Sequence, residues 1–518
     1  MNIPLILQPI FILLGTAAFT PIISTIGRKL NVERIREVFT ILAFLLSFYS
    51  IYLLYETVSR SGAFTFSLGG FLPAGGGVEL SADLFSIFMA FIICGVGLLV
   101  AVFSIRYMEK DSGLDNYYSL LLTLVAGMIG VFFAGDFFNL FVFWELMCIS
   151  SYALVSFRKD TWEPVEAGFK YLVMSTIGSL IVLYGISLLY GITGTVNFKL
   201  MKVSLSGLGQ QSTPLGLYLI IGLIIVGFGV TASIVPFHTW LPDAHPAAPS
   251  SISAMLSGVV IKTGVYALGR GLFTLFNPSL FDYGTVLLVF ALLTLTVGNF
   301  MALLQSDVKR LLAYSSIVNI GYIISGIGIA GYILNRYFAD QPAVALTAAS
   351  VALTGALFHI LNHALGKGLL FLGAGCYLRA TESRDIGELE GIGRRMPWTG
   401  GAFSIGLFSL AGIPPLSGFW SKLFIITAGL SMPADPFLTT ATAIIILNSI
   451  FSATYYLWLV QRVMLKEPRA KASQAAEAPF SMVAPIVILA IIIVILGLFP
   501  GLIVGLLEKV SKVFLGGW

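Results

Sequence analysis

Charged residues are scarce in this sequence. Asp, Glu, Lys and Arg together make up 10% of its 518 residues, whereas an average soluble domain carries about 25%. The mean hydropathy of +0.95 agrees with this scarcity. A chain with so few charges cannot cover its surface in water, so lipid is the solvent for most of it. The composition therefore excludes a cytoplasmic enzyme, a nucleic-acid-binding protein and a secreted disulfide scaffold.

Cysteine is almost as rare. Cys94, Cys148 and Cys376 lie far apart in apolar stretches and form no CxxC or CxxH spacing. This pattern supports neither an iron–sulfur cluster nor a structural zinc, so we predict no cofactor and no metal. The formal net charge of +4 is too small to imply a polyanionic partner. Because the chain has no redox motif, any electron chemistry in its assembly belongs to other subunits.

Long apolar runs, by contrast, fill most of the chain. A membrane-spanning helix needs about 20 apolar residues, and on that rule we predict about 14 spans. Their centres lie near Leu13, Leu46, Ile93, Val125, Leu146, Ile181, Ile224, Val260, Leu292, Gly321, Ala364, Leu410, Ile446 and Ile493. The runs lack strand-like alternation, so an all-α polytopic membrane protein is expected. No positive charge precedes the first run, which predicts a retained span instead of a cleaved signal peptide.

The basic residues predict the orientation. With the N-terminus outside, about 18 of the 29 Lys and Arg residues fall in inner loops and about 7 in outer segments. Positive residues collect on the cytoplasmic side of a membrane protein. We therefore expect a multi-pass protein of the cell inner or plasma membrane with both termini outside.

The four remaining basic residues lie inside predicted spans, and all four are lysines. They are Lys170, Lys262, Lys367 and Lys422, and one acid, Glu145, accompanies them. Four unpaired lysines at the bilayer centre would cost roughly 10–14 kcal/mol, which rivals the net stability of a typical domain. Buried lysine can release its proton, whereas arginine effectively cannot, so these groups indicate ion translocation. Lys170 lies near a span end, where it could instead snorkel toward the inner face.

Two histidines extend this set. His359, His363 and Lys367 follow i, i+4, i+8 spacing and share one helix face. A row of titratable groups on one face suits a proton relay, because histidine changes charge near neutral pH. The two histidines could instead hold a metal, but no third ligand and no HEXXH motif are apparent.

Prolines interrupt two of the predicted spans. Pro236 breaks the seventh, and Pro414-Pro415 breaks the twelfth. Irregular backbone at membrane depth survives only inside protein or beside a watery cavity, and paired breaks in corresponding halves indicate an inverted-repeat transporter. His238 and His245, beside the first break, either line a proton entrance or cap a turn.

The positions of these breaks predict how the chain is organised. We expect an N-terminal three-helix segment (1–110), a first repeat of spans four to eight (111–275), a second repeat of spans nine to thirteen (276–468) and a C-terminal helix (469–518).

Five segments identify a family resemblance between about Asp83 and Lys466. They read GDFFNLFVFWELMCISSYALV, VPFHTWLPDAHPAAPSSISAMLSGVVIKTGVYAL, DVKRLLAYSSIVNIGY, FHILNHALGKGLLFLGAG and LAGIPPLSGFWSKL. The chain resembles the antiporter-like membrane subunits shared by respiratory complex I, Mrp-type cation/proton antiporters and membrane-bound hydrogenases. Only LEKVSKVFLGGW follows the last span, which resembles the shorter, Mrp D-like type.

The resemblance implies fourteen helices, two inverted five-helix repeats and a polar axis along the membrane midplane. It also implies a multisubunit membrane complex with further antiporter-like subunits, in which H+ or Na+ moves. Glu145 would lie at the lateral end of one half-channel and Lys262 would be the connecting lysine. His359 and His363 would form the link to the terminal lysine, Lys422.

One position departs from the family pattern. Most members carry a lysine nine residues before the tryptophan of HTWLPDA, and here that residue is Thr231. Threonine can help to ligate a cation but cannot carry a proton charge, so either Lys170 or Lys262 substitutes or this half-channel has altered function. With His238 and Asp136, Thr231 is a candidate for the ion entrance.

Other classes of protein remain as alternatives. A structural subunit with an inactive first half-channel is favoured by Thr231. A stand-alone secondary transporter would also use broken helices, but it needs a dedicated substrate cavity. A membrane haem enzyme needs axial ligands from its helices, whereas two of the four histidines share one helix face.

Overall fold

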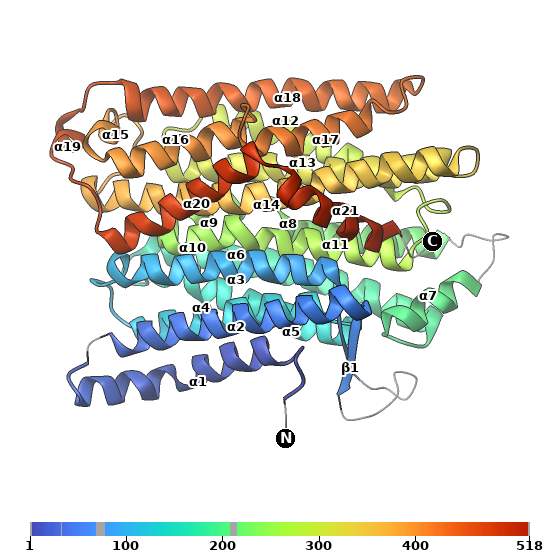
Figure 1. Ribbon diagram of the computed structural model, residues 1–518, viewed down its shortest axis with the longest axis horizontal. Helices are drawn as coiled ribbons and strands as arrows, with labels where there is room; N and C mark the ends of the chain where they lie inside the picture. The colour runs from blue at the N-terminus through green and yellow to red at the C-terminus, as the bar shows by residue number, and fades with distance from the viewer. Residues whose placement is uncertain (1–2, 33, 69–77, 208–214, 516–518) are drawn as a thin grey trace.

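The chain folds into a bundle of long helices that lie side by side along one common direction (Figure 1). The structure is a computed structural model and describes residues 3–32, 34–68, 78–207 and 215–515. Large apolar side chains cover both the core and much of the outer surface. A surface of this kind belongs in lipid, which confirms the predicted all-α polytopic membrane protein.

The first part of the chain, from α1 to α11, contains the first break. Its elements are α1 (Gln8–Lys29), α2 (Ile35–Ser61), β1 (Phe64–Leu68), β2 (Val78–Ala82), α3 (Leu84–Tyr107), α4 (Leu114–Phe133), α5 (Phe137–Val155), α6 (Trp162–Thr193), α7 (Phe198–Gly207), α8 (Leu215–Ala232), α9 (Leu241–Ala247), α10 (Ser250–Met255), the π-helix η2 (Leu256–Val260) and α11 (Ile261–Leu275). Strands β1 and β2 pair as an antiparallel hairpin, which the sequence had not predicted.

The second part contains the longest helices. Its elements are α12 (Tyr283–Leu303), α13 (Val308–Tyr337), α14 (Pro342–Thr381), α15 (Ile392–Arg395), α16 (Pro397–Ala411), α17 (Ser417–Gly429), α18 (Pro436–Val460), the π-helix η3 (Gln461–Leu465), α19 (Ala470–Ser473), α20 (Phe480–Leu498) and α21 (Gly501–Leu515). Each of the fourteen predicted span centres lies inside one of the helices of the two parts.

Thirteen helical segments among the described residues are long and apolar enough to cross a membrane. The pair α16 and α17 supplies one more crossing, because neither half is long enough alone. How the chain divides into repeats stays a prediction.

Both predicted breaks are present. Helix α8 ends before Ser233, which has a φ of +58°, and α16 ends before Gly412, which has a φ of +87°. The Trp240 indole Nε1 donates to the Val230 carbonyl at 2.9 Å and so ties the first break together. At the second break, a Cβ on Gly418 would overlap the carbonyl of the α16 residue that faces it, so glycine is required there.

Two faces of the bundle are distinguished by their loops. Ion pairs such as Arg158–Asp111 (2.8 Å) and Arg384–Glu163 (2.9 Å) join loops on what we call the basic face, at the end that carries α15 and α19 in Figure 1. The β1–β2 hairpin, α7 and the end of α21 lie at the other end, the hairpin face. Which face is cytoplasmic stays a prediction.

Candidate ion-translocation site

The site begins at Lys262, on the first turn of α11. Its side chain is 1% exposed, and its ammonium nitrogen donates to the Ser257 carbonyl at 2.7 Å. Ser257 belongs to the π-helix η2, and π-helical turns occur frequently at functional sites. This turn therefore holds the lysine at the centre of the bundle.

Helix α13 connects Lys262 to Lys367. The hydroxyls of Ser257 and Ser316 are 2.6 Å apart, and Ser316 donates to the Leu312 carbonyl at 2.8 Å. That carbonyl also accepts from the Lys367 ammonium, at 2.8 Å. Two hydroxyls and one carbonyl therefore join the η2 turn that binds Lys262 to Lys367.

Two further residues of α13, Ser315 and Asn319, link Lys367 to His359. Lys367 donates to the Ser315 hydroxyl, and the Asn319 amide donates to the Ser315 carbonyl at 2.6 Å. The Asn319 Oδ1 lies 3.0 Å from His359 Nε2. Because Oδ1 can only accept, His359 donates a proton from Nε2 in this arrangement.

The Ser421 hydroxyl responds to the charge of His359. Its oxygen lies 2.9 Å from His359 Nδ1 and 3.0 Å from the Gly418 carbonyl, and it has one proton to give. When His359 is neutral, the hydroxyl donates to Nδ1. When Nδ1 is protonated, the hydroxyl donates to Gly418 instead, so both charge states of the histidine are satisfied.

Lys422 ends this series, on α17 beyond the second break. It is 5% exposed, and its ammonium donates to the Ala411 carbonyl at 3.2 Å and to the Ser449 hydroxyl at 3.1 Å. The ammonium also lies 4.6 Å from the centre of the Tyr322 ring, in a cation–π contact. The same ring is 5.4 Å from that of His359.

These groups form one connected series, which we call the buried row. Its members are Lys262, Ser257, Ser316, Lys367, Ser315, Asn319, His359, Ser421 and Lys422. Among the described residues, none of its three lysines has a carboxylate partner within ion-pair distance. Their ammonium groups contact carbonyl and hydroxyl oxygens and an aromatic ring instead.

His363 lies beside the row. It is fully buried, and its ring stacks over that of His359 with centres 6.4 Å apart. Neither ring nitrogen has a hydrogen-bond partner in the part of the chain that the structure describes. An unpaired buried imidazole is costly.

Two of the predicted acidic and basic groups do not join the row. Glu145 is half-buried on α5, and its Oε1 is buried without a hydrogen-bond partner among the described residues. Lys170 is 48% exposed at the basic face, where it pairs with Glu166 at 2.9 Å and Asp243 at 3.2 Å. These two ion pairs hold the Lys170 ammonium at the basic face.

Two of the three candidates for the ion entrance lie at the first break, and the third lies at the start of α5. Thr231 is buried near the end of α8, and His238 is half-buried in the break that follows. Asp136 caps α5, where it accepts from the backbone nitrogens of Asn139 at 2.7 Å and Glu79 at 2.8 Å. Burial raises the pKa of Asp136, and these contacts give it a structural role on the hairpin face.

Sequence reasoning missed a further buried lysine. Lys309 was counted in an inner loop, yet it is 1% exposed at the start of α13 and donates to the Ala248 carbonyl at 2.6 Å. It also missed the polar spacers Ser315 and Asn319. Their i, i+4 spacing in an otherwise apolar helix was the available signal.

Comparison with known proteins gives consistent results. A model described as the NADH:quinone oxidoreductase/Mrp antiporter transmembrane family matches residues 134–338 and 341–452. Another, described as the N-terminus of complex I chain 5, matches residues 76–118. NADH-quinone oxidoreductase subunit N from Desulforudis audaxviator is 31% identical over 466 residues, which is 86% of each chain. The D-type Na+/H+ antiporter subunit from Alkalihalophilus pseudofirmus is 33% identical over 398 residues, covering 77% of this chain and 76% of its own.

Solved structures agree with these relatives. A chain of the membrane-bound sulfane sulfur reductase, an archaeal respiratory membrane complex, superposes with a TM-score of 0.84 and 30% identity, covering 98% of this chain and 97% of its own. A chain of the Mrp complex from a Dietzia species gives a TM-score of 0.83 over 98% of this chain and 96% of its own. At 24% identity, that second match supports the fold alone.

Proposed function

The chain belongs to the NADH:quinone oxidoreductase/Mrp antiporter family, and we propose that it is an ion-translocating subunit of a multisubunit membrane complex. It translocates H+, Na+ or both, and protons move along the buried row. Its partners are other membrane subunits, including further antiporter-like ones. Redox chemistry or a cation gradient in those partners drives the movement. The complex lies in the cell inner or plasma membrane, with both ends of this chain outside.

The observation that carries the proposal is the continuity of the buried row. Hydrogen bonds and one shared aromatic ring link Lys262 to Lys422 across five helical elements (α11, η2, α13, α14 and α17), with Lys367 and His359 between them. A set of lysines that served only to hold the fold would be paired with carboxylates. Here the lysines are joined instead through carbonyl, hydroxyl, amide and imidazole groups, of which the amines, hydroxyls and imidazole can exchange protons.

Electrostatic coupling between neighbouring groups supplies the mechanism. Two unit charges 4 Å apart interact by about 4 kcal/mol at an effective dielectric constant of 20. Adding a proton to one lysine therefore makes it harder to charge its neighbour. A partner subunit that perturbs one end of the row can then load a proton from one side of the membrane and eject it to the other.

We expect Ser421→Ala to slow ion translocation by about 2- to 10-fold, the effect of losing one hydrogen bond of roughly 0.5–1.5 kcal/mol. The alanine removes the hydroxyl that satisfies both charge states of His359. Translocation is measured with pH- and Na+-sensitive dyes in proteoliposomes that contain the complex purified through this chain. Ser421→Thr retains the hydroxyl and restores the rate. Equal rates for the alanine and threonine variants would contradict the proposed relay through His359.

The first half of the chain contributes less to translocation. Position 231 holds threonine where the family resemblance implies a lysine, and Lys170 pairs elsewhere, with Glu166 and Asp243. We assign Glu145 to the lateral end of the path, where a neighbouring subunit acts on it.

We therefore expect Glu145→Gln to slow translocation by less than about tenfold, well below the effect expected of a group that transfers the proton itself. The same proteoliposome assay measures it. Complete loss of translocation would show that the first half-channel works despite Thr231. If Glu145→Gln slows translocation more strongly in a Thr231→Lys background than in the wild type, the assignment is supported.

A further inference from the structure

A polar vestibule opens on the basic face above the buried row. It has a volume of about 260 Å³ and is lined by charged side chains and three apolar residues of α6 and α9. The charged residues are Glu163, Glu166, Lys170, Asp243, Asp307, Arg310 and Arg384. They are cross-linked by ion pairs, in which Arg310 binds Asp243 at 3.2 Å and Arg384 binds Asp307 at 3.2 Å. Water and protons from the basic face therefore reach a site with four carboxylates and three cations.

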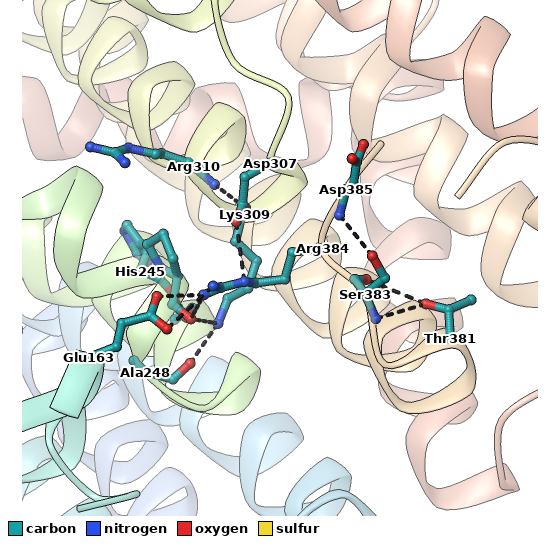
Figure 2. A network of polar contacts seen from close by, with 12 residues as sticks. Glu163, His245, Ala248, Asp307, Lys309, Arg310, Thr381, Ser383, Arg384 and Asp385 are labelled. Atoms are coloured by element: carbon teal, nitrogen blue, oxygen red, sulfur yellow. Dashed lines mark hydrogen bonds and ion pairs between the residues drawn. The ribbon is translucent and has the colours of Figure 1, made fainter. Parts of the chain in front are cut away.

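Lys309 lies directly beneath this vestibule. The Pro246 carbonyl, which belongs to a vestibule residue, accepts from Arg384 at 2.8 Å and from the buried Lys309 ammonium at 3.4 Å. Figure 2 shows the Lys309 side chain passing Arg384 to reach the Ala248 carbonyl. One carbonyl thus contacts both Arg384 of the vestibule and a lysine that is almost completely buried.

His245 continues the path inward. It is fully buried, and neither of its ring nitrogens has a hydrogen-bond partner among the described residues. Its ring stacks on Phe371, with centres 4.5 Å apart and planes 16° from parallel. Phe371 is four residues beyond Lys367 on α14, so the histidine packs one helical turn from that lysine on the same helix face. The line of titratable groups on α14 therefore extends through His245 toward Lys309.

We propose that Lys309 and His245 form a proton branch that connects the vestibule on the basic face to Lys367 of the buried row. This inference rests on the proposed function and names the route by which its ion enters or leaves. A vestibule water or carboxyl group gives a proton to the neutral Lys309 amine. The resulting ammonium passes it to one nitrogen of His245, and the other nitrogen releases a proton toward Lys367. Each group returns to its starting state, so the net change is one proton moved.

The chemistry of the branch selects the proton over Na+. Sodium ions are ligated by oxygen atoms, whereas the groups beneath the vestibule are an amine and an imidazole. The carbonyls of Ala248 and Pro246 already accept from the Lys309 ammonium. Sodium can therefore gather at the carboxylates of the rim but is not ligated by the groups of the branch. The route also avoids Thr231, the position at which the family resemblance implies a lysine.

The variant His245→Phe separates the branch from a structural role. Phenylalanine retains the stack on Phe371 and removes two buried nitrogens that lack partners among the described residues, so the fold is kept or stabilised. We expect proton translocation in proteoliposomes of the whole complex to fall by about 10²-fold or more, the usual contribution of a positioned acid–base group. Unchanged proton flux in this variant would overturn the proposal.

Lys309 is tested with two substitutions. Lys309→Gln removes the charge, and Lys309→Arg keeps it but cannot release the proton. Both are expected to lose translocation to the same extent, whereas a lysine that only braces the α9–α10 loop would be rescued by arginine. The control is Lys159→Gln, an exposed residue of the same face outside the vestibule, which is expected to behave as the wild type. Rescue by Lys309→Arg would overturn the role of Lys309 as a proton carrier.

The result for Lys422→Gln distinguishes failure of the branch from failure of the proposed function. If Lys422→Gln loses translocation but His245→Phe and Lys309→Gln do not, the proposed function stands and the branch is wrong. If Lys422→Gln also retains translocation, the proposed function itself fails.

Discussion

Replacing Lys422 with glutamine is expected to abolish ion translocation while leaving the complex assembled. Glutamine is of similar length and can donate to the Ala411 carbonyl and the Ser449 hydroxyl, but it cannot carry a charge. The expected loss is about 10²–10⁴-fold, as for removal of a positioned acid–base group. Assembly is retained because a neutral side chain is cheaper to bury than a lysine, by up to about 2.5–3.5 kcal/mol on insertion scales.

Two measurements accompany this variant. Dye-reported proton flux in proteoliposomes gives the rate, and size-exclusion chromatography with subunit analysis gives the assembly. Lys509→Gln, at an exposed position of α21, serves as the matched control and is expected to have wild-type flux. Normal flux in the assembled Lys422→Gln complex would refute the role of Lys422 as the end of the row.

The second large effect is expected at Lys367, where the paths converge. Its ammonium binds the Leu312 carbonyl on the side of Lys262 and the Ser315 hydroxyl on the side of His359. Lys367→Gln removes the ionisable group that joins the two sides, and we expect a loss of about 10²-fold or more in proton flux. The same proteoliposome assay measures the flux, with Lys509→Gln again as the control.

Lys367→Arg shows whether the charge or the proton matters. Arginine stays protonated under all physiological conditions, so it conserves the positive charge but cannot pass a proton. A relay predicts that this variant is as inactive as Lys367→Gln. If arginine supports normal flux in the same vesicle assay, Lys367 acts only as a fixed charge and protons do not pass through it.

Much of the fold could be predicted from the sequence because a helix that crosses a lipid bilayer needs a long apolar run. A span must be long and apolar, so the predicted centres all fall in helices, and the prolines at 236 and 414–415 mark real breaks. Lys262, Lys367 and Lys422 stood out because each interrupts a long apolar run. Such interruptions are visible without knowledge of packing.

Other features depend on tertiary contacts and were not visible. Lys309 follows Asp307 and precedes Arg310, so it reads as part of a charged loop, whereas in the fold its ammonium is buried against the Pro246 and Ala248 carbonyls. Lys170 lies in α6, which is long and apolar enough to span, and the contact with Asp243 from a distant segment holds its ammonium at the basic face.

The hydrogen-bond partners of the row's lysines and histidine also could not be predicted from the sequence. Ser315 and Asn319 are ordinary residues of a transmembrane helix until His359 and Lys367 are placed against them. A hydrogen-bond pattern of this kind follows from helix packing, which the spacing of one sequence does not determine.

The most direct test of the buried row compares Lys262→Gln, Lys422→Gln and the double variant in one flux assay. If protons pass along a single row, the two lysines act in series, so either substitution blocks the path and the double variant is no slower than the singles. We therefore expect three equally low rates. Appreciable residual flux in each single variant, together with much lower flux in the double variant, would show two independent paths and contradict the central claim.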